Sequence, residues 1–228
     1  MKCAASLSLA AALLFACSSG GSGGVAPGTD GGNGGADGGV DGNGNTTKCP
    51  YPAGPYGTQV GDVVDGSLSW AGYVDDAAQA TTVTMSDYYD CDGTKGINAV
   101  LVDESAVWCG DCISEAMQIA PMLSAQWKSE GVKLVVLMAQ NADTANPGPA
   151  SLEDALTWRN EFALITGTAV CADPQWTERV WGIPASSGAE NGFPTNTIVD
   201  PRTMKIVAIQ PASVFGTVDN LAKANGGS

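Results

Sequence analysis

The sequence predicts an α/β fold in which a mixed central sheet carries helices on both faces. Two observations point to it. Short continuous apolar runs, which are typical of buried strands, alternate with longer segments of helical pattern. Two late strands are joined by a tight turn and followed by a final helix. Parallel strands need helical crossovers while a hairpin pairs antiparallel, so the predicted sheet is mixed and layered between other elements.

The first half of the domain begins with little regular structure. Residues 51–89 contain short alternating pieces, where we expect an N-terminal hairpin and loops. Residues 98–103 are the first buried strand. A helix is expected over residues 110–130, and Gly131 is a suitable residue to end it. Pro121 should kink this helix, because its ring removes an N–H and clashes with a carbonyl one turn back.

The second half continues the alternation. Residues 132–138 are the next apolar strand, and Ser151 with Asp154 forms a capping box for a helix that continues to about residue 164. The remaining expected elements are a strand at 168–172, a short helical piece at 175–181, a loop at 182–192, a strand at 195–199, a turn at 200–203, a strand at 205–209 and a helix at 214–224.

The N-terminus predicts export. Within residues 1–16, Lys2 precedes an apolar run that is too short to span a bilayer, as in a secretory signal. Residues 14–17, Leu-Phe-Ala-Cys, resemble the bacterial lipobox, in which the cysteine is lipidated and becomes the new N-terminus. We therefore expect a lipid anchor at Cys17, with an ordinary signal cleaved nearby as the alternative. The expected location is the periplasm or cell surface, and Ser18 favours the outer membrane by analogy with enteric sorting.

Residues 17–47 predict a flexible tether and residues 48–228 a single domain. The stretch 18–47 holds 13 glycines with serine, aspartate and asparagine, and cannot bury enough apolar surface to order itself. Its Asp-Gly-Gly repeats superficially resemble calcium-binding repeats, but no glutamate closes a loop, so a plain tether is favoured. The formal charge of −14 argues against nucleic acid or anionic lipid as partners, which leaves the lipid anchor as the expected contact with a membrane.

Five cysteines lie in the domain, and an exported compartment permits disulfides among them. Cys109 and Cys112 pair by proximity. Cys49 and Cys91 both lie in loop-like surroundings before the core and are a tentative structural pair. Cys171 lies in an apolar strand and is expected to act as a small core residue. At least one of these last three cysteines is free or pairs elsewhere.

Trp-Cys-Gly-Asp-Cys, residues 108–112, carries the most chemistry. Two residues between the cysteines fit one helical turn, and a helix start favours a thiolate on Cys109. Such a pair is redox-active, half of a zinc site, or a structural disulfide. The chain has no histidine and no second Cys-x-x-Cys, and so small a loop yields little stabilising entropy. We therefore expect a redox-active disulfide with no metal and no cofactor.

These residues resemble the thioredoxin superfamily. Residues 100–103, Ala106 and residues 108–112 line up without gaps against its active-site segment. A second landmark is Gly-Phe-Pro-Thr at 192–195, which is followed by a strand and a turn. The resemblance implies a thioredoxin-like fold in which Pro194 is cis and packs against the disulfide. The expected export, tether, N-terminal hairpin and inserted strand–helix segment look like the TlpA/ResA-like redoxin group.

The resemblance also implies a role for each site residue. Cys109 would attack a substrate disulfide and Cys112 would resolve the mixed disulfide. Asp103 stands at the place of a buried carboxylate that exchanges a proton with Cys112, although a capped or solvated strand-end aspartate is the alternative. Glu115 matches the active-site glutamate of the TlpA/ResA-like group, or is a first-turn acid favoured by the helix dipole. Trp108 would shield the disulfide.

The implied activity is that of a monomeric thiol–disulfide oxidoreductase acting on protein thiols with a separate electron donor. Asp111 replaces the usual proline between the cysteines, and its charge should disfavour the thiolate, so we expect a reducing couple. Met117 stands where the family usually kinks its helix with proline, and Leu137 lies near the place of thioredoxin's partner lysine.

Three other functions compete. A redox-silent thioredoxin-like binding module would keep the fold without the activity. A peroxiredoxin-like peroxidase needs a Thr-x-x-Cys nucleophile with a nearby arginine, and Ala106 stands at the threonine position. Copper chaperones of this fold use histidine with Cys-x-x-x-Cys, and the chain has neither.

Overall fold

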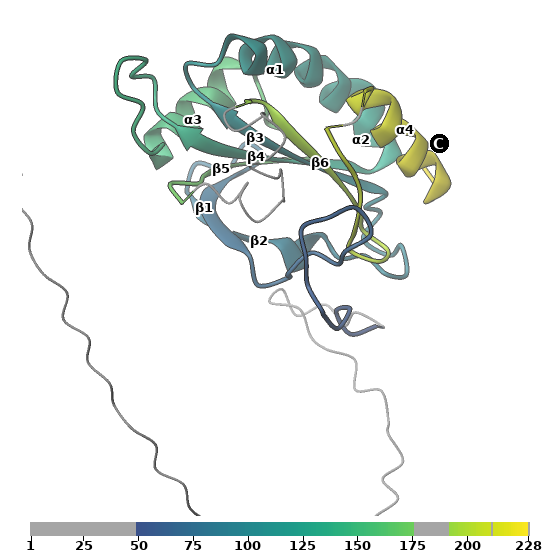
Figure 1. The fold of residues 1–228 in the computed structure, drawn as a ribbon. Coiled ribbons are helices and arrows are strands. Elements are labelled where there is room, and N and C mark those ends of the chain that lie inside the picture. The colour runs from purple at the N-terminus through teal and green to yellow at the C-terminus, as the bar shows by residue number, and fades with distance from the viewer. Residues whose placement is uncertain (1–48, 176–191, 211, 228) are drawn as a thin grey trace, which may run out of the picture. The chain divides into compact units, whose positions relative to one another are not determined.

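The computed structural model describes residues 49–175, 192–210 and 212–227 (Figure 1). The predicted signal peptide, Cys17 and the tether therefore lie outside the described residues. The same holds for most of the helical piece and the loop expected between residues 175 and 192. None of the helices in the described ranges combines the length and apolar character that a bilayer crossing requires.

The described strands form one mixed seven-stranded sheet in the order β2-β1-β5-β4-β3-β6-β7. Its bounds are β1 Ser69–Val74, β2 Thr81–Thr84, β3 Ala99–Ala106, β4 Val132–Gln140, β5 Thr168–Ala172, β6 Thr195–Asp200 and β7 Lys205–Ile209. The three central strands β3, β4 and β5 run parallel, and β6 and β7 continue the sheet antiparallel beyond β3. The mixed sheet expected from the sequence is confirmed.

The N-terminal hairpin is part of this sheet. Strands β1 and β2 pair antiparallel, and β1 also pairs antiparallel with β5, which places Gly72 opposite Cys171. A Cβ at Gly72 would meet the Cys171 Sγ at 2.5 Å, so the close approach of the two strands requires glycine here. The hairpin therefore extends the central sheet at the β5 side.

The predicted helix at 110–130 is divided in three. Regular α-helix α1 covers Gly110–Met122, a π-helical turn η2 covers Leu123–Trp127, and α2 covers Lys128–Glu130. The α-helical pattern ends one residue after Pro121, which cannot donate the N–H that this pattern needs. Gly131 ends the segment with a left-handed φ of 72°, as expected for a helix C-terminus.

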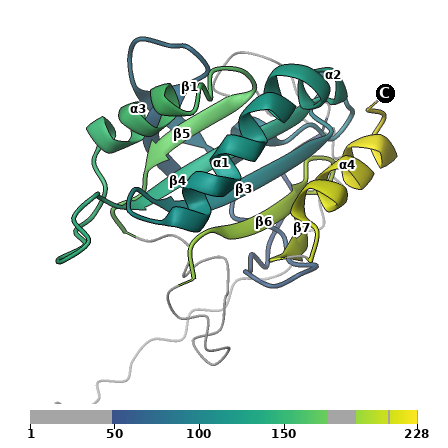
Figure 2. The same ribbon diagram turned by 90° about the horizontal axis from the view of Figure 1, so that it is seen from above.

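Helices α1, α3 (Leu152–Glu161) and α4 (Val214–Ala224) all cover the same face of the sheet (Figures 1 and 2). Their residues Ile119, Trp158 and Val218 share one core cluster with Leu101 and Leu134 of the central strands.

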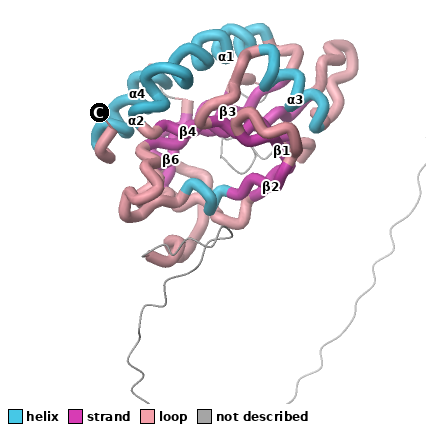
Figure 3. Tube along the Cα trace, turned by 180° about the vertical axis from the view of Figure 1, so that it is seen from behind, coloured by secondary structure: helices cyan, strands magenta, loops and turns pink. Residues whose placement is uncertain are grey.

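The described cover of the second face contains less helix than that of the first face. Among the described residues its helical cover is the short 3-10 helix η1, Met85–Tyr88, beside β2 (Figure 3). The rest of the cover comes from the N-terminal segment, whose Tyr51 and Val64 pack in the second core cluster, and from Tyr89. The Cys49–Cys91 disulfide ties this segment down. Within the described ranges, η1 and the aromatic side chains of Tyr51 and Tyr89 therefore cover this face, and most of the helical piece expected at 175–181 lies outside them.

Candidate active site

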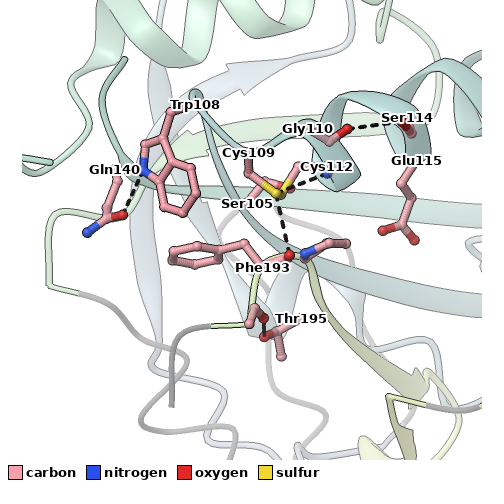
Figure 4. The surroundings of a disulfide bond; sticks show 12 residues. Ser105, Trp108, Cys109, Gly110, Cys112, Ser114, Glu115, Gln140, Phe193 and Thr195 are labelled. Carbon is pink, nitrogen blue, oxygen red and sulfur yellow. Dashed lines mark hydrogen bonds between the residues drawn. A yellow bond between two sulfur atoms is a disulfide. The ribbon is translucent and has the colours of Figure 1, made fainter. Parts of the chain in front are cut away.

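The two cysteines of the motif form a disulfide at the start of α1 (Figure 4). Their Cα atoms lie 5.2 Å apart. Cys109 is the N-cap residue, and its Sγ accepts a hydrogen bond from the Cys112 N–H at 3.0 Å. This N–H is one of the donors that a helix start leaves without an intrahelical acceptor, so it can stabilise negative charge on a Cys109 thiolate. Cys109 is 4 % exposed and Cys112 is 1 % exposed, so Cys109 is the slightly more exposed residue of the two.

The loop before β6 stands opposite the disulfide. The Phe193–Pro194 peptide bond is cis, and the Phe193 carbonyl oxygen lies 3.4 Å from the Cys109 Sγ (Figure 4). The Gln210 side chain holds this loop, because its Nε2 donates to the Pro194 carbonyl at 2.6 Å. A reduced Cys109 thiol would find a hydrogen-bond acceptor in the Phe193 carbonyl.

Trp108 lies beside the disulfide and is 37 % exposed. Its Nε1 donates to Gln140 Oε1 at the end of β4 at 2.8 Å, and its ring meets the edge of the Phe193 ring at a centroid distance of 6.1 Å. These two contacts fix the indole at the rim of the site (Figure 4). Trp108 and Phe193 therefore offer an apolar border next to Cys109.

Asp103 on β3 and Glu115 on α1 form a pair of neighbouring carboxyl groups. Asp103 is buried on β3 and accepts from the Ser105 hydroxyl, whose Oγ lies 3.0 Å from each carboxyl oxygen. Burial raises the pKa of Asp103 well above its usual value, the neighbouring Glu115 charge raises it further, and the Ser105 hydrogen bond opposes both. Burial also raises the pKa of Glu115. The structure thus brings together two predicted site residues that lie twelve positions apart in the sequence.

Asn196 completes this cluster and was not identified from the sequence. It lies on β6 directly opposite Asp103, and its Nδ2 donates to both Glu115 carboxyl oxygens, at 3.0 and 3.2 Å. This hydrogen bonding lowers the pKa of Glu115 against the effect of burial. The sequence feature that could have identified Asn196 is its position two residues after Pro194 on a predicted strand.

The cluster lies on the same face of the sheet as the disulfide. Asp103 is on the same face of β3 as Leu101, and that face packs against the cluster that contains Cys112. Burial disfavours the ionised form of both carboxyl groups, and the Glu115 charge further disfavours ionisation of Asp103, so the pKa of each is raised.

Two positions at which the sequence departs from the family pattern face solvent. Asp111 and Met117 are exposed on α1. No group of cysteine and acidic side chains in the described ranges could hold a metal ion.

The remaining cysteines lie away from this site. Cys49 and Cys91 form a disulfide with Cα atoms 6.5 Å apart, which is the pairing the sequence left open. Cys171 is a free thiol buried in β5, and burial raises its pKa to about 12. Glu104 is a further buried carboxyl on β3, on the opposite face from Asp103. It was missed because it follows Asp103 directly in a segment expected to end there.

The fold and the disulfide at a helix start together define a thioredoxin-like domain with a Cys-x-x-Cys centre. No protein-family model and no curated protein matches the chain. Among solved structures, AhpC from Enterococcus faecalis is 12 % identical, with 72 % of this chain and 91 % of that chain covered and a TM-score of 0.51. This likeness confirms the thioredoxin-like fold.

Two further solved structures are similar over comparable lengths. A thiol:disulfide interchange protein from Bacteroides sp. is 20 % identical, covering 75 % of this chain and 92 % of that chain with a TM-score of 0.48. The thioredoxin domain of a thiol-disulfide oxidoreductase from Bacteroides vulgatus is 21 % identical, covering 72 % and 98 % with a TM-score of 0.45.

Proposed function

We propose that this protein is an exported thiol–disulfide oxidoreductase that reduces disulfides in other proteins. The observation that carries the proposal is the Cys109–Cys112 disulfide at the start of α1, facing the cis-proline loop at Phe193 and bordered by Trp108. This arrangement supplies a helix-start N–H for a thiolate, a backbone acceptor and an apolar rim. A disulfide with a purely structural role needs none of these three features.

The reaction uses both sulfurs. In the reduced protein the Cys109 thiolate attacks one sulfur of a substrate disulfide, and the other substrate sulfur leaves as a thiolate. Cys112 then gives up its proton to the buried carboxyl pair and attacks Cys109 Sγ, which releases the second substrate thiol and forms the Cys109–Cys112 bond. Two electrons have passed to the substrate, and a separate dithiol donor must return them.

The reducing direction is supported by Asp111. A negative charge between the cysteines disfavours the thiolate form and so favours the disulfide relative to the reduced pair. Since Asp111 is exposed, the effect is screened and small. A couple poised in this direction gives electrons to substrate disulfides.

The proposed location is the periplasm or the cell surface, on a lipid attached to Cys17, with the outer membrane favoured by Ser18. The stretch 17–47 would act as a tether, with ends roughly 30 Å apart as a flexible coil. Such a tether would let the domain reach protein substrates while it stays at the membrane.

Insulin reduction by a dithiol tests the activity. The wild-type protein should accelerate the precipitation of insulin, and Cys109→Ser should abolish the acceleration. Cys171→Ala is the matched control, since Cys171 is a buried thiol outside the site, and should retain activity. No acceleration by wild type with an intact, fully reducible Cys109–Cys112 pair would instead favour a redox-silent binding module. Turnover of peroxide in place of insulin would favour a peroxidase.

A further inference from the structure

Within the described residues, the Asn196 side chain forms hydrogen bonds through its amide nitrogen and not through its amide oxygen. Its Nδ2 donates to both carboxyl oxygens of Glu115, at 3.0 and 3.2 Å. Its Oδ1 is buried and accepts no hydrogen bond within the part of the chain that the structure describes. Asn196 is 2 % exposed, so water does not readily replace a missing partner. When a buried amide only donates hydrogen bonds to a carboxyl group, it stabilises one protonation state of that group more than the other.

The favoured state is the ionised one. A carboxylate accepts hydrogen bonds through both oxygens, and a neutral carboxylic acid has to donate one. Two donated bonds from Nδ2 therefore match a charged Glu115. The reversed amide would place Oδ1 against Glu115 and would require the proton on Glu115. The orientation of the amide and the protonation of Glu115 thus go together.

Asp103 has the opposite surroundings. It lies directly across from Asn196 in the strand pairing and is buried at 2 % exposure. Among the described residues, the hydrogen-bond donor to Asp103 is the hydroxyl of Ser105. One hydroxyl compensates a buried charge less than an amide donating to both oxygens, and the nearby Glu115 charge adds repulsion. When the pair holds one proton, the free energy is therefore lower with that proton on Asp103 than on Glu115.

We propose that Asn196 is a positioning residue that keeps the charge of the carboxyl pair on Glu115 and the proton on Asp103. Among the described residues, the charged group that acts on Asp103 is Glu115, and the thiols of Cys109 and Cys112 become titratable on the same face of the sheet after reduction. Ser105 and Asn196 add only neutral dipoles.

The use of this proton rests on the proposed oxidoreductase function. When a donor dithiol regenerates the protein, one donor thiolate attacks Cys109 Sγ and the Cys109–Cys112 bond breaks. The electron pair of that bond leaves on Cys112 Sγ, which takes the proton from Asp103. The second donor thiolate then displaces Cys109 as a thiolate, and the donor leaves as a disulfide. Asp103, now ionised, is the base that takes the proton back when Cys112 attacks Cys109 in the next cycle.

The test is a pH titration of the side-chain carboxyl carbons by NMR, in the oxidised full chain. In the wild type, Glu115 should ionise at lower pH than Asp103. In Asn196→Ala, Glu115 loses its donors, so its titration should move to higher pH and the interval between the two should narrow by about one pH unit or reverse. Asn196→Gln keeps an amide donor and should restore part of the interval.

Thr197→Val is the matched control, because Thr197 is also buried on β6 and faces the other side of the sheet. It should leave both titrations unchanged. A wild type in which Asp103 ionises before Glu115 would overturn the proposal, even if the Asn196 variants do not fold. An unchanged interval in a folded Asn196→Ala would overturn it too.

This readout does not depend on the activity. If insulin reduction is absent but Glu115 still ionises first and responds to Asn196→Ala, the oxidoreductase proposal fails while the role of Asn196 holds. In an active protein, Asn196→Ala should also shift the pH profile of dithiol reduction of the disulfide. A purely structural role for Asn196 would lower stability without moving that profile.

Discussion

Asp103 occupies a position where an apolar side chain would be expected to stabilise the fold. It is buried in the middle of the sheet, and its hydrogen-bond donor is a serine hydroxyl. Ionising such a group costs free energy unless a cation or several donors compensate it. The cost is explained if the group exists to exchange a proton with Cys112, since function is a common reason for a strained or unfavourable residue.

The first prediction follows from the raised pKa of Asp103. In the unfolded chain this carboxyl loses its proton at lower pH than in the folded protein. The folded state therefore binds more protons between the usual and the raised pKa, and stability falls as pH rises through that interval. Asp103→Asn should remove this loss. Within the interval, the free energy of unfolding of the variant should therefore rise relative to that of the wild type by about 1.4 kcal/mol per pH unit. Chemical denaturation at several pH values measures it, and an advantage as large at pH 4 as at pH 8 would contradict the assignment.

The second prediction concerns Asp111. Asp111→Asn removes one exposed negative charge from the first turn of α1. The reduced pair should then become relatively more favourable, and the reduction potential should rise by about 10 to 20 mV, as expected for an exposed charge worth less than 1 kcal/mol. Equilibration with glutathione measures the potential. Glu153→Gln is the control, because it removes an acidic side chain from the first turn of a different helix, α3. This variant should leave the reduction potential unchanged. An unchanged or lower potential in Asp111→Asn would refute the proposed effect.

Residues near the motif and the distant Pro194 were predictable from the resemblance, and the distant hydrogen-bonding partners of the site were not. Asp103, Trp108 and Glu115 lie within a few positions of the cysteines, so one aligned segment identifies them all. Asn196 and Gln140 act through side-chain hydrogen bonds that depend on strand register. A one-residue shift in register would turn either side chain to the other face, and the sequence alone does not fix the register to that precision.

At the scale of elements, apolar runs and capping residues predicted the strands and helices well. The strand over 168–172, the strand over 205–209 and the helix over 214–224 have the predicted bounds. Strand β3 runs three residues further than expected, to Ala106, because its polar residues Asp103, Glu104 and Ser105 are buried. Polarity indicated a strand end where the fold instead uses buried polar groups.

The third prediction concerns the start of α3. Ser151 caps this helix by accepting from the Asp154 N–H, while Asp154 accepts from the Ser151 N–H. Ser151→Ala should lower the free energy of unfolding by about 1 kcal/mol, the usual cost of losing such a cap. Denaturant unfolding measures the change. Insulin reduction should stay at the wild-type rate, and a loss of activity would mean that α3 takes part in the site.

At the scale of the whole molecule, the second face of the sheet depends on the N-terminal segment. Tyr51 and Tyr89 pack edge to face with ring centroids 5.2 Å apart, and the Cys49–Cys91 disulfide joins the start of the domain to the loop after η1. Composition predicted irregular structure here, because the segment is rich in glycine, proline and aspartate. Its role as cover for a core face is a long-range property that local patterns do not reveal.

The fourth prediction tests this disulfide. The two cysteines are 42 residues apart, and closing a loop of that size stabilises the folded state by about 4 kcal/mol in the chain-entropy model. The double variant Cys49→Ala/Cys91→Ala should lose stability of that order. It should keep its insulin-reducing activity below its midpoint of unfolding. A stability change under 1 kcal/mol would show that the disulfide is not what holds this segment.

In the proposed reaction, Cys109 attacks substrate disulfides and Cys112 resolves the mixed disulfide. Trapping tests it most directly: reduced Cys112→Ser and Cys109→Ser proteins are each mixed with a disulfide-bonded substrate, and the covalent products are identified by mass spectrometry. Cys112→Ser should accumulate a stable mixed disulfide at Cys109, and Cys109→Ser should form little or none. Equal trapping at Cys112, or none at a reduced and folded Cys109, would contradict the account.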